Sequence, residues 1–159
     1  MLNKLKKTSN KGFTIIEVMI VLAIAGMIIL VVLLAVPAVQ RSGRNAAIKT
    51  DAGAVAAGIS EFSTNNNGAV PSGATAISTA AGTVTFSGAA GTTPTTAKVQ
   101  GATTVTQSTA AALPVAAGAG AITVWLAHSC AGTPSTRAFA IVYATEGTGG
   151  TLTQQCQDS

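Results

Sequence analysis

The N-terminal part of the chain contains two different hydrophobic patterns. The first runs from Val18 to Val36, where the sequence is continuously apolar and uncharged. As an α-helix this run is about 28 Å long, close to the roughly 30 Å hydrocarbon core of a bilayer. The alternative is a buried helix in a soluble core, but a chain of 159 residues has little material to surround a helix that is apolar on every face. We therefore expect a membrane-spanning helix.

The second pattern begins beyond Pro37, where apolar residues recur every three or four positions. These residues are Ile48, Ala52, Val55, Ile59 and Phe62. The spacing predicts one apolar stripe on a continuing helix. The polar residues Lys49, Asp51, Ser60 and Glu61 fall largely off the stripe. We expect the stripe to lie against a folded head and the helix to end in the run from Asn65 to Gly68.

The middle of the chain, from Ala69 to about Gly120, consists mainly of Ala, Gly, Thr and Ser, with Lys98 as its one charged residue. Disorder is one interpretation of this composition. However, the β-favouring runs 83–87 and 103–107 indicate loops with short strands. The threonine-rich surface is a candidate for O-linked sugars, a hypothesis that no specific motif supports; there is no Asn-x-Ser/Thr sequon.

The clearest strand signals are the last three, at residues 121–127, 138–144 and 151–157. The last two predict a hairpin. The largest candidates to cover the helix stripe are Phe62, Trp125, Ile141 and Tyr143. Together the patterns predict an α+β fold, in which a long N-terminal helix packs on a small antiparallel β-sheet head.

The basic residues are concentrated at the start of the chain. The formal net charge is +4, and four lysines, Lys4, Lys6, Lys7 and Lys11, precede the apolar run. Without residues 1–12, five basic residues face five acidic ones. The charge is therefore no indication of nucleic-acid binding. It favours a cytoplasmic N-terminus. Arg41 and Arg44, which lie beyond the apolar run, weaken this charge asymmetry only in part.

Residues 11–19, KGFTIIEVM, join this basic leader to the apolar run. A general secretory signal would have a shorter apolar region followed by a small-residue cleavage site, which AVPA matches poorly. The glycine, the phenylalanine after it and a glutamate five residues beyond the glycine resemble the type IV pilin family, and in particular a type IVa-like major pilin. The close resemblance covers about residues 4–36.

The resemblance implies a set of processing and assembly residues. A prepilin peptidase would cut between Gly12 and Phe13, and Phe13 would then be N-methylated. A carboxylate at the edge of an apolar span needs a partner or a function, unless it reaches the interface. In the family the glutamate, here Glu17, is thought to meet the terminal amine of a neighbouring subunit. The proline usual in the membrane half of the helix is later here, at Pro37, so whether the helix loosens between Gly26 and Pro37 stays open.

The same resemblance sets the expected domains, partners and location. Residues 1–12 form a removed leader, 13–40 a transmembrane and filament-core helix, 41–64 its amphipathic half, and 65–159 the β-sheet head. The expected partners are other copies of the chain in a helical polymer, prepilin peptidase, the pilus assembly platform and, before assembly, the inner membrane. The precursor would lie in the cytoplasmic membrane with its N-terminus inside, and the mature subunit in an extracellular pilus.

The two cysteines, Cys130 and Cys156, would lie outside the cytoplasm, where they can oxidise to each other. Such a C-terminal pair is frequent in the family. The rival interpretation is a metal site that adds His128, although these three residues do not form a tight cluster of ligands. We expect no metal and no cofactor.

The sequence gives little basis for an enzyme, because it offers one histidine, four carboxylates beyond the apolar run and no nucleophile or phosphate-loop motif. We expect a structural subunit of a type IV pilus that serves adhesion, motility or DNA uptake. One alternative is a pseudopilin of a type II secretion or competence system. Major secretion pseudopilins tend to carry an acidic calcium-binding loop, for which only Glu146 and Asp158 could serve. Another alternative is an anchored adhesin that does not polymerise.

Overall fold

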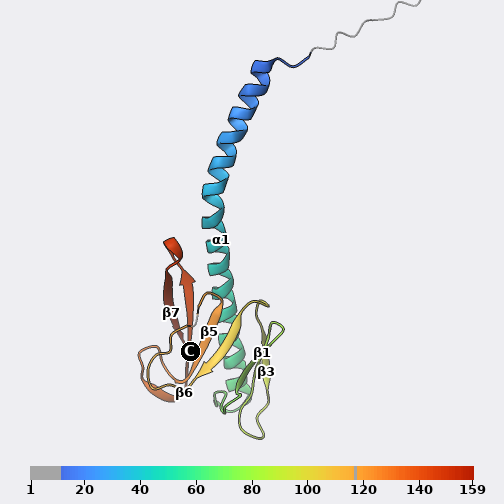
Figure 1. The fold of residues 1–159 in the computed structure, drawn as a ribbon. Coiled ribbons are helices and arrows are strands. Elements are labelled where there is room, and N and C mark those ends of the chain that lie inside the picture. The colour runs from blue at the N-terminus through green and yellow to red at the C-terminus, as the bar shows by residue number, and fades with distance from the viewer. Residues whose placement is uncertain (1–11, 117) are drawn as a thin grey trace, which may run out of the picture. The chain divides into compact units, whose positions relative to one another are not determined.

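The computed structural model describes residues 12–116 and 118–159 (Figure 1). One long helix, α1 (Ile15–Asn65), precedes the strands. The strands are β1 (Ile77–Ala80), β2 (Thr83–Phe86), β3 (Thr95–Lys98), β4 (Thr104–Ser108), β5 (Ala121–His128), β6 (Pro134–Glu146) and β7 (Leu152–Asp158), with a 3-10 turn, η1 (Thr148–Gly150), before β7. The predicted leader lies outside the described residues, except for Gly12.

The strands form two sheets within residues 40–159. The first has the order β1-β2-β3 and is antiparallel. The second has the order β4-β5-β6-β7, in which β4 and β5 are parallel and the other pairs antiparallel. The α+β fold class is confirmed, but the expected single antiparallel sheet is replaced by two sheets, one of them mixed. The parallel pair requires a long crossover, which residues 109–120 supply.

All five predicted strands are present, as β2, β4, β5, β6 and β7, and the predicted β6–β7 hairpin is confirmed. β1 and β3 were not predicted from the sequence. β1 turns into β2 through Ala81 and Gly82, which both have positive φ angles, of 48° and 74°. Such turns usually contain Asn-Gly or Asp-Gly, so the alanine conceals the hairpin from sequence patterns.

The chain divides at Val39 and Gln40 into two units, and α1 runs through the boundary. In unit 2 (Gln40–Ser159) the predicted stripe of α1 is buried, from Ile48 to Phe62. The stripe shares one hydrophobic core with both sheets, including Phe86 of β2, Val124 of β5 and Ile141 of β6. α1 ends at Asn65, before the turn at residues 66–68, as predicted.

Trp125 was predicted to cover the helix stripe, and this prediction is wrong. Val124 and Leu126 on either side of it belong to the core that contains the stripe. Side chains alternate along a strand, so Trp125 lies on the other face of the sheet. There it is fully buried, and its Nε1–H donates to the carbonyl of Ala110, 2.7 Å away in the crossover. Tyr143 does pack against the core, partly buried.

Asp51 is a second correction, because it is buried although the helical spacing placed it off the stripe. Both of its carboxylate oxygens accept from the backbone N–H of Gln100 at 3.2 Å. Oδ2 also accepts from Thr103 Oγ1 at 2.5 Å. Asp51 therefore attaches α1 to the segment between β3 and β4. Burial of a carboxylate is tolerated here because these donors replace water.

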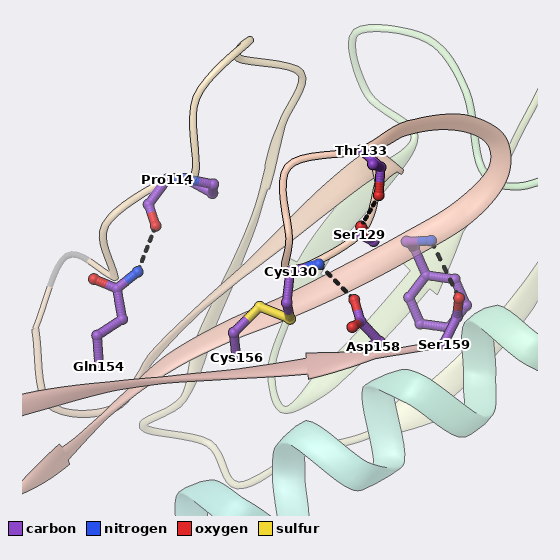
Figure 2. The surroundings of a disulfide bond; sticks show 9 residues. Pro114, Ser129, Cys130, Thr133, Gln154, Cys156, Asp158 and Ser159 are labelled. Atoms are coloured by element: carbon purple, nitrogen blue, oxygen red, sulfur yellow. Dashed lines mark hydrogen bonds between the residues drawn. A yellow bond between two sulfur atoms is a disulfide. The ribbon is translucent and has the colours of Figure 1, made fainter.

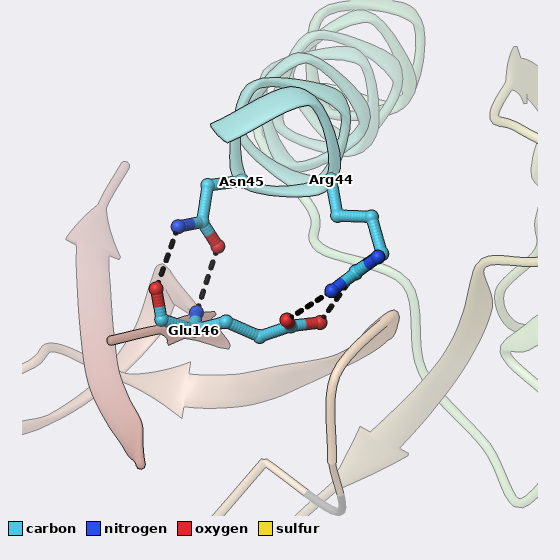
Figure 3. Close-up of polar contacts among 3 residues, drawn as sticks. All are labelled: Arg44, Asn45 and Glu146. Atoms are coloured by element: carbon cyan, nitrogen blue, oxygen red, sulfur yellow. Dashed lines mark hydrogen bonds and ion pairs between the residues drawn. The ribbon is translucent and has the colours of Figure 1, made fainter. Parts of the chain in front are cut away.

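A second polar attachment joins α1 to the end of β6 (Figure 3). The Asn45 side-chain amide donates to the Glu146 carbonyl at 2.8 Å and accepts from the Glu146 N–H at 2.7 Å, as a neighbouring strand would. The Arg44 guanidinium donates through Nε and Nη2 to the two oxygens of the Glu146 carboxylate, at 2.7 and 2.6 Å. Glu146 is thus held by its backbone and by its side chain.

Gly58 is a position where α1 approaches the first sheet closely. Gly58 is buried, its carbonyl accepts from Thr95 Oγ1 at 3.0 Å, and a Cβ atom at this position would overlap the ring of Phe86. Phe86 is itself fully buried, so its ring has little freedom to move. The glycine therefore allows the close approach of the helix to the sheet.

We predict that Gly58→Ala destabilises unit 2 by about 1 to 3 kcal/mol, since the new methyl group overpacks the core. Gly53→Ala is the matched control, because Gly53 is exposed on the same helix with no atom within 4 Å of its added Cβ. That control should stabilise by about 0.5 to 1 kcal/mol through helix propensity alone. Denaturation of the full chain in detergent, followed by the fluorescence of its one tryptophan, measures both. Equal effects of the two substitutions would contradict the close approach.

The Arg44–Glu146 pair predicts a pH dependence. The side-chain hydrogen bond from Arg44 lowers the pKa of the Glu146 carboxyl below its usual value of 4.5. The contribution of the pair to stability is therefore fully present above 4.5 and is lost as the pH falls through the lower folded value. Glu146→Gln should consequently destabilise unit 2 at neutral pH and make no difference at a pH well below the folded value. A loss that is the same at both pH values would show that the charge of Glu146 is not involved.

Candidate functional site: the N-terminal segment and the disulfide

The predicted processing residues lie in an exposed segment immediately before the helix. Gly12, Phe13 and Thr14 have no regular secondary structure, and α1 begins at Ile15. The Phe13 side chain is 83% exposed. The backbone between Gly12 and Phe13 is therefore accessible and not held in a helix. A peptidase requires such a conformation, because a helical peptide bond is shielded by its own hydrogen bonds.

Thr14 is a residue that the sequence analysis missed. Its Oγ1 accepts from the backbone N–H of Glu17 at 3.3 Å, and the hydroxyl contacts Glu17 Oε2 at 3.5 Å. Thr14 thus caps the N-terminus of α1, and Glu17 occupies the position of the acidic residue of a capping box. The signal was visible in the sequence as Thr-x-x-Glu before an apolar run. The Glu17 carboxylate also lies in the first turn, where the helix dipole favours a negative charge.

The apolar part of α1 in unit 1 is exposed along its length. Its most hydrophobic window is long and apolar enough to cross a membrane, and none of that window is buried. The residues between Gly26 and Pro37 are helical. This surface has a shallow depression of about 350 Å³, lined by Phe13, Glu17, Val18, Val21 and Leu22. So much apolar surface is unfavourable in water, so lipid or other protein must cover it.

The disulfide between Cys130 and Cys156 is present, with a Cα–Cα distance of 5.9 Å (Figure 2). Cys156 lies in β7, and Cys130 lies in the turn after β5. The Cys130 N–H donates to Asp158 Oδ1 at 2.5 Å, and Ser129 and Thr133 hydrogen-bond through their hydroxyls across the same turn. The turn is therefore fixed to the C-terminal strand by a covalent bond and by a charge-assisted hydrogen bond.

His128 does not meet the requirements of the rival metal site. Its ring stacks on Trp125, with centroids 4.4 Å apart and planes 3° from parallel, and its Nδ1 lies 3.0 Å from the carbonyl of Leu126. Cys130 and Cys156 are joined to each other. Among the described residues, no three His, Cys, Asp or Glu side chains are grouped closely enough to hold a metal ion.

Comparison with protein families gives one match, the prokaryotic N-terminal methylation motif, over residues 7–33. This range contains Gly12, Phe13, the Thr14–Glu17 cap and most of the exposed apolar helix. Comparisons with curated proteins and with solved structures give no match. The match overlaps the start of the long helix α1, and together they support a type IV pilin-like precursor.

Proposed function

We propose that this protein is a structural subunit of a type IV pilus. Prepilin peptidase cuts it between Gly12 and Phe13, Phe13 is N-methylated, and the mature chain polymerises into a surface filament. The observation that carries this proposal is the methylation motif at residues 7–33, most of which belongs to the exposed helix α1, a helix that cannot remain uncovered in water. In the precursor the bilayer covers this helix. In the filament, helices of other copies replace the lipid.

The proposal gives Glu17 a specific role. Cleavage at Gly12 would create a positively charged amine on Phe13, close in sequence to the exposed carboxylate. Helices that are apolar on every face have little in their packing to fix an axial offset between copies. A charge pair between the amine of one copy and Glu17 of the next would define one offset, which makes it a determinant of register more than of stability.

The head would serve as the outer surface of the filament. The disulfide and the buried core of unit 2 favour a folded domain in an oxidising compartment outside the cytoplasm. Adhesion, motility and DNA uptake would then be properties of the assembled fibre. The alternative of a calcium-binding pseudopilin receives less support, because Glu146 is paired with Arg44 and Asp158 accepts a hydrogen bond from Cys130.

Processing can be tested on material sheared from cells that express the chain. We expect mass spectrometry to find an N-terminal peptide that begins at Phe13 and carries a methyl group on its amine. The control is the same analysis of the membrane fraction after deletion of the prepilin peptidase, where the leader should persist. A full-length chain with residues 1–12, found only in membranes of normal cells, would leave an anchored protein and would contradict the filament proposal.

Glu17 can be tested with two substitutions that separate its charge from its capping. Glu17→Gln retains a side chain that suits a capping box but removes the charge, whereas Glu17→Ala removes both. We expect both variants to be processed at Gly12 and both to give much less sheared filament. Glu61→Ala, which removes an exposed carboxylate from the same helix, is the control and should assemble normally. Normal filament yield from Glu17→Gln would show that the charge does not direct assembly.

A further inference from the structure

The last strand, β7 (Leu152–Asp158), has a neighbour on one side only. At the ends of the β6–β7 ladder, the Gly147 N–H donates to the Thr151 carbonyl and the Ser159 N–H donates to the Phe139 carbonyl. The register between these ends is continuous, so the odd-numbered residues of β7 hydrogen-bond to β6. The N–H and C=O groups that point to the open side belong to the even-numbered residues Leu152, Gln154, Cys156 and Asp158.

These outward groups have no backbone partner in the described part of the chain. Leu152, Cys156 and Asp158 are exposed, and Gln154 is half-buried. The orientation of Glu146 agrees with this register. Glu146 is opposite Leu152, and its own N–H and C=O point away from β7, where they bond to Asn45 (Figure 3).

The other sheet edges contact another segment or carry a lysine, and β7 differs from them. On the β4 edge, Thr79 of β1 donates to the Val105 carbonyl at 3.1 Å, and Gln107 accepts from the Ile77 N–H at 3.0 Å. β3 contacts α1 through Thr95 and carries Lys98. Natural edge strands are commonly protected by lysine, proline, a bulge or a covering segment. β7 contains no lysine or proline, and its register has no bulge.

Exposed apolar side chains gather beside this same edge. Of the described residues in unit 2, the large hydrophobic side chains that are exposed are Leu113, Val115 and Leu152. Leu152 is on β7. Leu113 and Val115 flank Pro114, whose carbonyl accepts from Gln154 Nε2 of β7 at 2.7 Å (Figure 2). An open strand edge therefore lies next to apolar surface, a combination typical of surfaces that bind another chain.

We propose that the β7 edge binds the β7 edge of a second copy, antiparallel, about a two-fold axis at Gln155. In this register Leu152 is opposite Asp158 of the second copy, and Gln154 is opposite Cys156. Every outward N–H and C=O of both strands then finds a partner, because the outward residues of an antiparallel pair must be opposite one another. Registers centred on Gln154 or Cys156 leave some of these groups unpaired.

The charges on β7 agree with a second copy as the occupant. Asp158 is the only charged residue of the strand, and the proposed register places it opposite the neutral Leu152 instead of another carboxylate. Thr153 is opposite Gln157, so threonine and glutamine side chains face each other across the axis. The pairing therefore brings no like charges together, which would otherwise destabilise a cross-strand pair.

This contact would act between filaments, a consequence that rests on the proposed function. A two-fold contact is closed, because the same surface is used on both copies, and it cannot propagate along a polymer. It would instead join the heads of two neighbouring filaments side by side. The pairing of two heads itself does not require filaments, so it can be tested separately from assembly.

The first test is oxidative cross-linking of the full chain purified in detergent. Gln155→Cys places the two new thiols directly opposite each other at the axis, within reach of a disulfide. Gln157→Cys is the matched control on the same strand and the same face, where the two thiols would be about 13 Å apart. We expect a cross-linked dimer from Gln155→Cys and little from Gln157→Cys. Equal dimer from both variants, or none from Gln155→Cys, would overturn the proposed pairing.

The second test uses charge instead of thiols, so it is independent of the native disulfide. Gln155→Lys and Gln155→Glu each place like charges opposite each other and should abolish the dimer, whereas their mixture places lysine opposite glutamate and should restore it. Mass photometry of the full chain in detergent measures the dimer fraction. If the mixture behaves like the single variants, β7 does not pair with itself. Failure of filament formation in cells with an intact mixed dimer would contradict the proposed function and leave this inference standing.

Discussion

The N-terminal part of the structure is dominated by the exposed apolar surface of α1 in unit 1, which the described part of the chain does not bury. The most hydrophobic window of the helix is uncovered, although burial of apolar area is the main force in folding. A helix of this kind is stable only where lipid or other chains surround it. The first turn of a helix leaves N–H groups without partners inside the helix, and the Thr14–Glu17 cap satisfies one of them.

Unit 2 is stabilised in a different way, because it is built from small residues that offer little apolar area. It compensates by close approach and by side-chain bonds to the backbone. Gly58 lets α1 meet Phe86, Asp51 bonds the segment after β3, and Asn45 extends the β6 ladder. The disulfide adds about 3 to 4 kcal/mol by the loop-entropy model. For a thin core this is a substantial share of a net stability of about 5 to 15 kcal/mol.

The sequence predicted features that repeat along the chain, and it missed features that depend on a single tertiary contact. The stripe from Ile48 to Phe62 and the long strands were predictable because period 3.6 and period 2 recur over many residues. The cysteine pair was predictable because there were only two candidates. Asp51 and Trp125 were misplaced because their surroundings are set by segments far away in sequence. Thr14 is different, because its capping motif, Thr-x-x-Glu before an apolar run, is visible in the sequence alone.

The disulfide also bears on the open edge of β7. An edge strand held by one neighbour is prone to fray, since each of its ladder bonds can be replaced by water. Here the disulfide of Cys156 fixes the strand to the turn after β5, and the Asp158 carboxylate accepts a hydrogen bond from the Cys130 N–H. The Gln154 side chain donates a hydrogen bond to the Pro114 carbonyl in the crossover. All three residues are even-numbered, so their side chains lie on one face while their backbone groups point to the open side. β7 is therefore held rigid by its side chains, which leaves its backbone free to bind another strand at low cost in conformational entropy.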